Sequence, residues 1–156
     1  MTTHHLVLAA PGLDGGRLFG AVTYSALAAV AAICLVSGMR GSKKVRIKDD
    51  PDKVGALAIV TGTLCVAAGG TWQDFAQAFG DNASSSFTQS GLGEFGQGGI
   101  SLVLTALTFV PDWKKKIIIP AVLGIAAAVT FHTAGGSWGL IINLILTPAR
   151  MITGNA

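Results

Sequence analysis

Four polar side chains in or beside the most apolar stretches could carry chemistry: Glu94, Gln97, His132 and Asn143. A carboxyl, an imidazole and two amides can relay protons, bind ions or hydrogen-bond between helices, which hydrocarbon cannot do for them. We expect Glu94 to face protein or water rather than lipid, with His132 as its partner. Asn143 is expected to hydrogen-bond between helices or subunits.

No catalytic arrangement accompanies these four side chains. The sequence has no HExxH motif, no Walker A motif and no nucleophile, base and acid set within an apolar segment. The glycines from Gly91 to Gly96 have the spacing of a dinucleotide loop, but a polar segment precedes them where such a loop needs a hydrophobic strand. His4 and His5 lack further ligands at metal-binding spacing. We predict a protein that is not an enzyme, without cofactor or metal.

The elements that hold these residues are indicated by composition. Of 156 residues, 51% are hydrophobic and 12% are charged, against about 25% charged in an ordinary soluble domain. This balance excludes an intrinsically disordered chain, and two cysteines cannot staple a disulfide-rich domain. Long uncharged segments predict an all-α, polytopic transmembrane bundle of four or five hydrophobic helices, a single integral membrane domain covering 1–156.

The expected membrane spans are the uncharged segments of the chain. Residues 18–38 and 54–72 are long enough to cross a hydrocarbon core of about 30 Å. Residues 92–110 cross only by including the polar positions at their start. Residues 117–134 form a fourth expected span, which ends at a Gly-Gly-Ser break. Residues 138–151 predict a short helix that either crosses or re-enters the membrane, and both readings stay open.

Two clusters of basic residues set the expected orientation. Lys and Arg remain on the cytoplasmic side of short loops, so loops 39–53 and 111–116 are predicted to be cytoplasmic, with the N-terminus outside a bacterial inner membrane. The acidic residues Asp49 to Asp52 argue against nucleic acid as a partner. The two clusters hold nine of the eleven basic residues: Arg40, Lys43, Lys44, Arg46, Lys48, Lys53, Lys114, Lys115 and Lys116.

Aromatic residues mark the expected membrane interfaces. Trp72, Trp113 and Trp138 fall at predicted span ends, where amphipathic rings act as interfacial anchors. Residues 71–79 place aromatic and small apolar residues at helical spacing and predict an amphipathic helix on the outer leaflet. The Ser- and Asn-rich residues 81–90 that follow predict a flexible loop.

Small residues recur at four-residue spacing, for example Ala58 with Gly62, and Gly124 with Ala128. This spacing allows helices to approach closely, within a bundle or between subunits. Cys34 and Cys65 are expected at depths about 12 Å apart, too far for a disulfide.

These features favour a small bacterial integral membrane protein that serves as a non-enzymatic structural subunit of a membrane-embedded assembly. Its expected partners are the lipid bilayer, further copies of the chain and other membrane protein subunits. One alternative is a holin-like oligomeric pore, in which the four polar residues would share a wet face. A second alternative is an accessory subunit of a channel or transporter.

Overall fold

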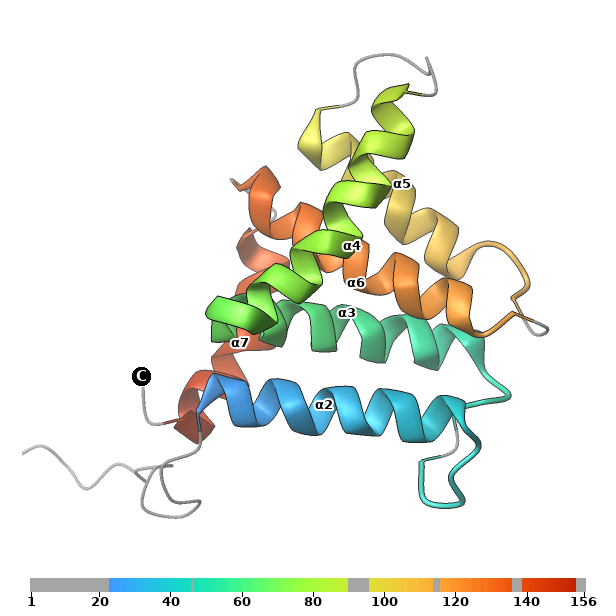
Figure 1. Cartoon of the computed structure of the whole chain (residues 1–156), viewed down its shortest axis with the longest axis vertical. Helices are drawn as coiled ribbons and strands as arrows, with labels where there is room; N and C mark the ends of the chain where they lie inside the picture. The colour runs from blue at the N-terminus through green and yellow to red at the C-terminus, as the bar shows by residue number, and fades with distance from the viewer. Residues whose placement is uncertain (1–22, 46, 90–95, 114–115, 136–138, 154–156) are drawn as a thin grey trace, which may run out of the picture.

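A computed structural model describes residues 23–45, 47–89, 96–113, 116–135 and 139–153. This part of the chain contains helices and no strand (Figure 1), which confirms the all-α expectation. The six helices are α2 (Tyr24–Met39), α3 (Pro51–Ala68), α4 (Gly70–Gln89), α5 (Gln97–Phe109), α6 (Ile118–Ala134) and α7 (Gly139–Thr153).

Helix α6 forms the centre of the bundle. It packs against α3, α4 and α5, while α2 covers the outside of α3 (Figure 1). Every residue from Gly124 to Phe131 is buried. A helix that is apolar all the way round has no face suited to water, so enclosure by three neighbours is the arrangement expected for it.

Small residues bring α3 and α6 close together. A Cβ added to Gly124 would lie 2.7 Å from the carbonyl oxygen of Gly55 and 2.8 Å from the Cβ of Ala58. A Cβ added to Gly62 would lie 2.8 Å from the Cβ of Ala128. The small-residue spacing predicted from the sequence is therefore used inside the chain, where the two helix backbones nearly touch.

The hydroxyl groups of the core are satisfied within their own helices. The Thr61 hydroxyl donates to the Leu57 carbonyl and the Thr108 hydroxyl to the Leu104 carbonyl, each at 2.8 Å. The buried Thr63, Ser101 and Thr130 bond in the same way, one turn back. Within the described residues, no buried side-chain nitrogen or oxygen lacks a partner. Such back-bonding lets a helix carry hydroxyls into apolar surroundings.

Helix α3 ends earlier than the expected span of residues 54–72. Gly69 and Gly70 adopt positive φ angles of 71° and 52° and turn the chain into α4. Glycine accepts this left-handed backbone because it has no Cβ. Trp72 therefore belongs to the first turn of α4 rather than to the end of α3.

Helix α4 contains the predicted amphipathic helix, but the prediction of a flexible loop from residue 81 is wrong up to Gln89. The Asn82 side chain donates to the Ala78 carbonyl, and the Ser86 hydroxyl donates to the Asn82 carbonyl at 2.7 Å. Gly80 packs against Val129 of α6, where an added Cβ would lie 2.8 Å from the valine Cβ. Tertiary contact and back-bonding thus override the weak helix propensity of Ser and Asn.

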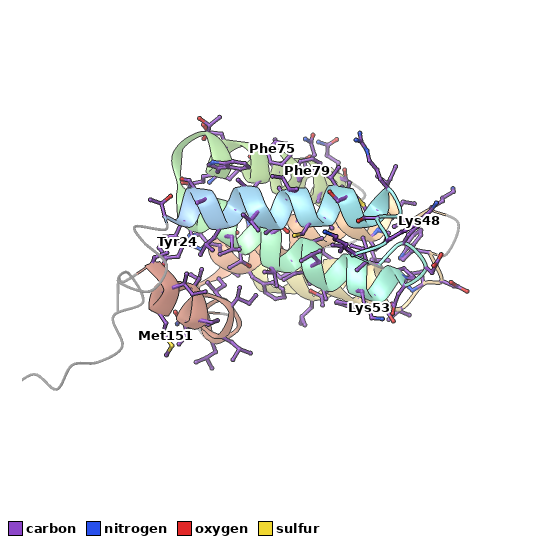
Figure 2. The ribbon with its side chains drawn as sticks, turned by 90° about the horizontal axis from the view of Figure 1, so that it is seen from below. Tyr24, Lys48, Lys53, Phe75, Phe79 and Met151 are labelled. Atoms are coloured by element: carbon purple, nitrogen blue, oxygen red, sulfur yellow. The ribbon has the colours of Figure 1, made fainter. Side chains whose placement is uncertain are left out.

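One helix of the described part, α3, is long and apolar enough to cross a membrane by length and composition. Helices α2, α5 and α6 are apolar but shorter, with 16, 13 and 17 residues. Residues 18–22 and 92–95, at the starts of two expected spans, lie outside the described residues. Helix α7 contacts α2, α3 and α6. Met151 near its end lies at the same end of the bundle as Tyr24 (Figure 2).

Candidate functional site

The two charged turns of the sequence lie at one end of the bundle. The α2–α3 turn and the α5–α6 turn are adjacent (Figure 1). Together they line an acidic recess that contains four carboxylates, those of Asp49, Asp50, Asp52 and Asp112. The described members of the two basic clusters are all exposed: Arg40, Lys43, Lys44, Lys48, Lys53 and Lys116. Arg46, Lys114 and Lys115 lie outside the described residues. We call this the basic end; which side of a membrane it occupies stays a prediction.

Local backbone geometry folds the α2–α3 turn back on itself. The Arg40 N–H donates to the Val36 carbonyl at 3.0 Å and closes α2. Gly41 follows with a φ of 84°, a conformation that favours glycine. The Lys48 side chain lies over Gly41, since an added Cβ there would be 3.2 Å from the lysine Cδ. The fold of the turn therefore brings the Lys48 side chain close to Arg40, and both line the same recess.

This folding produces a polar recess of about 390 Å³ at the basic end. We call it the basic recess. It contains three cationic side chains and one carboxylate, and it is lined by Arg40, Gly41, Ser42, Lys43, Lys48 and Asp49. Lys44 belongs to the same turn but does not line the basic recess.

Asp50 and Lys53 pair with each other where the α2–α3 turn leads into α3. Asp50 is the N-cap of α3, and its carboxylate accepts a hydrogen bond from the Lys53 N–H at 3.3 Å. The Lys53 ammonium lies 2.9 Å from the second carboxylate oxygen. The side-chain hydrogen bond from Lys53 lowers the pKa of Asp50 below its ordinary value. Lys53 is thus engaged on the α3 side, away from the basic recess.

An apolar groove of about 190 Å³ begins beside the basic end. One wall is the C-terminal half of α2, and the facing wall is the N-terminal half of α6. The floor comes from α3 and the far end from α4. The lining residues are Ala32, Leu35, Val36, Met39, Thr61, Gly62, Cys65, Phe75, Phe79, Ile118, Ala121, Val122 and Ile125. Because the Thr61 hydroxyl is bonded to its own helix, the groove presents an almost purely hydrocarbon surface.

The position of the groove relates it to the basic recess. Met39 lines the groove and Arg40, the next residue, lines the basic recess. At the far end, the Phe75 and Phe79 rings meet edge to face with centroids 5.1 Å apart. Figure 2 shows both rings beside α2, between Tyr24 and the Lys48 end. The groove therefore runs from the charged end toward the middle of the bundle.

Both cysteines are unpaired, and Cys65 lies in the groove floor. The groove was not predicted from the sequence. Its α2 residues have helical spacing, but α2 is apolar on every side, so no stripe distinguishes the groove wall from the outer face.

The four polar residues singled out by sequence are only partly brought together. Gln97 begins α5, and its side-chain oxygen accepts a hydrogen bond from the Thr133 hydroxyl at 3.4 Å. His132 is exposed beside Thr133, in the last turn of α6. Asn143 is exposed on α7, where its backbone carbonyl accepts from the Thr147 hydroxyl. Glu94, and so its expected pairing with His132, lies outside the described residues.

The expected interfacial tryptophans lie in different settings. Trp72 is half-buried against the core at the start of α4. The Trp113 indole N–H donates to the Leu107 carbonyl at 2.9 Å and folds back on the end of α5. Trp138 lies outside the described residues. A membrane-interface role stays a prediction for all three.

In the described part of the chain, no three His, Cys, Asp or Glu side chains gather closely enough to hold a metal ion. No protein-family model, curated protein or solved structure matches this chain.

Proposed function

We propose that this is a small integral protein of a bacterial inner membrane, acting as a non-enzymatic structural subunit of a membrane assembly. The observation that carries the proposal is the outer surface of the bundle. Large apolar side chains are exposed on α2, α5 and α7, including Val30 at 59%, Ile33 at 64% and Leu144 at 77%. Scattered apolar residues are normal on a protein surface, but faces of this kind on several helices indicate contact with lipid or with partners.

The distribution of charge supports the same proposal. Helices α2, α5 and α6 contain no Asp, Glu, Lys or Arg. The described members of the two basic clusters gather at one end, as expected for loops retained on the cytoplasmic side. Arg150, beside Met151 on α7, belongs to the other end. The core buries hydroxyls that are bonded within their own helices, an arrangement compatible with a lipid solvent.

The structural-subunit role is favoured over the holin-like pore by the placement of polar residues. A pore lined by the four candidates requires them on a common wet face. Gln97 meets Thr133 near the end of α6, Asn143 is on α7, and the groove within the bundle is apolar. The accessory-subunit alternative shares the membrane location and differs only in its partner.

Membrane embedding is tested by placing one charge at two positions. Ile33→Lys puts an ammonium on the exposed middle of α2, whereas Ser42→Lys adds the same charge to the basic turn. In a bilayer the first change costs about 3 kcal/mol and reduces insertion, while the second is tolerated. The measurement is the fraction of protein resistant to carbonate extraction of membranes. Equal fractions for both variants, or wild-type protein released without detergent, would contradict membrane embedding.

Assembly is tested with wild-type protein extracted in mild detergent. Native mass spectrometry is expected to show a defined oligomer or a complex with another membrane subunit. A chain that is monomeric in detergent, and that captures no partner when cross-linked in native membranes, is not a structural subunit.

A further inference from the structure

We infer that the protein binds one anionic phospholipid at its basic end, with an acyl chain in the apolar groove and the phosphate in the basic recess. The inference rests on the proposed membrane location and adds a specific ligand to it.

The groove has the dimensions of an acyl chain rather than of a partner helix. The wall from Ala32 to Met39 is about 10 Å long at 1.5 Å per residue, roughly two thirds of one leaflet of a 30 Å core. A helix segment of that length and about 10 Å in diameter occupies roughly 800 Å³. The groove holds about 190 Å³. An extended hydrocarbon chain can enter this space, whereas a helix can only lie across it.

The groove is open to the surroundings along its rim. Val36, Ile118 and Phe75 are exposed by 44%, 70% and 53% although each also lines the groove. A lipid chain can therefore enter sideways from the bilayer. It would replace the missing contacts on these side chains without displacing any part of the fold.

The basic recess supplies the complementary charge for the headgroup. Arg40, Lys43 and Lys48 line it together with one carboxylate, Asp49, so its net charge is positive. Arginine can bind a phosphate through two N–H groups, and lysine adds a compact positive charge. Because Arg40 directly follows Met39, a phosphate in the basic recess and a chain in the groove can belong to one molecule.

The orientation predicted for the chain places this site in the leaflet that contains anionic lipid. Basic residues next to a span attract such lipids on the cytoplasmic side. A zwitterionic lipid would bring a second positive charge to a recess that is already positive. We therefore expect phosphatidylglycerol to bind more tightly than phosphatidylcholine with the same acyl chains.

The headgroup contact is tested on the full-length protein in mild detergent. Native mass spectrometry measures the binding of added dioleoyl-phosphatidylglycerol. Replacement of Arg40, Lys43 and Lys48 by Gln is expected to lower the affinity roughly fivefold for each charge removed. Lys44→Gln is the matched control, since Lys44 is on the same turn but outside the basic recess. An equal loss from Lys44→Gln would overturn the site in favour of diffuse surface attraction.

The acyl contact is tested by filling the groove. Ala32→Phe places a ring in the groove and is expected to lower phosphatidylglycerol affinity at least tenfold. The control Ala26→Phe alters an exposed position of α2 outside the groove and should leave affinity unchanged. Circular dichroism establishes that each variant remains helical. Retained affinity in a folded Ala32→Phe protein would overturn the inference.

Two further results separate the possible failures. Glycerol phosphate, which has no acyl chain, is expected not to compete; full competition would identify a site for free phosphate and overturn the lipid assignment. Equal binding of phosphatidylglycerol and phosphatidylcholine by carbonate-resistant protein would overturn only this inference. Release of the protein from membranes without detergent would instead overturn the proposed function, on which this inference rests.

Discussion

Helix α6 packs directly against α3, whereas a groove lies between α6 and α2. Against α3 the facing positions are Gly55, Ala58 and Gly62, and an added Cβ on Gly124 would collide with the opposite backbone. Against α2 the facing positions include Leu35, Val36 and Val122, and a groove of about 190 Å³ separates the helices. Helix α6 therefore has one closed flank and one open flank. Small residues close the contact with α3. On the other flank α2 and α6 both pack on α3, and α3 forms the floor of the groove between them.

The closed contact leaves the least room for change. Gly124→Leu forces a side chain against the Gly55 carbonyl oxygen, 2.7 Å from the new Cβ. Backbone cannot rotate away, so the two helices must separate and the protein is expected to lose its folded state in detergent. Unfolding by sodium dodecyl sulfate, followed by circular dichroism and gel mobility, measures the effect.

The control for this change is Gly139→Leu at the start of α7, where an added Cβ meets nothing within 4 Å. It is expected to unfold at nearly the wild-type detergent concentration. If both leucine variants unfold alike, the contact between α3 and α6 is looser than the structure indicates.

The closed and open flanks of α6 also predict different costs for removing a phenylalanine ring from the core and from the groove. Phe131 is 4% exposed in the core around α6, whereas Phe75 is 53% exposed at the groove. Phe131→Ala leaves a cavity and is expected to cost about 3 kcal/mol, at the low end of the range for such changes. Phe75→Ala enlarges a space that is already open and is expected to cost under about 1 kcal/mol.

Reversible unfolding titrations of both alanine variants provide the measurement. A cost for Phe75→Ala equal to that of Phe131→Ala would show that the groove is filled by protein in the folded state. That result would also remove the space assigned to an acyl chain.

Sequence reasoning predicted the helices better than their contacts. The uncharged segments predict helical structure because backbone groups in apolar surroundings must bond internally. The break after Ala68 has a local signal in Gly69 and Gly70. The continuation of α4 beyond residue 80 has none, because its cause is the contact of Gly80 with Val129 on a distant helix.

The small-residue spacing also predicts close packing without showing which helices make the contact. Ala58 with Gly62 and Gly124 with Ala128 predict close packing, but other pairs at this spacing, such as Gly135 and Gly139, look equivalent in the sequence. Which pairs face each other depends on helix rotation, and an apolar helix without a polar face gives no signal for rotation. The groove was unpredictable for the same reason, since it depends on how α2 is turned toward α6.

The smallest expected loss of stability comes from a substitution in the α2–α3 turn, where Asp50 and Lys53 lie. Asp50 caps α3 and pairs with Lys53, and its pKa is lowered by that hydrogen bond. Asp50→Asn keeps a side-chain acceptor at the cap and removes the charge. We expect a small loss of stability at neutral pH, because an exposed ion pair is screened by solvent.

The pH dependence identifies the ion pair as the cause. A carboxyl whose pKa is lower in the folded state stabilises the protein above its unfolded pKa of about 3.9, and this contribution disappears as pH falls through the folded pKa. Wild type and Asp50→Asn should therefore differ slightly at pH 7 and converge in acid, as measured by thermal unfolding in detergent. Since Lys53 is engaged by Asp50 rather than by the basic recess, the same substitution should leave phosphatidylglycerol affinity nearly unchanged. A large change in lipid affinity would mean that the cap and the basic recess act as one site.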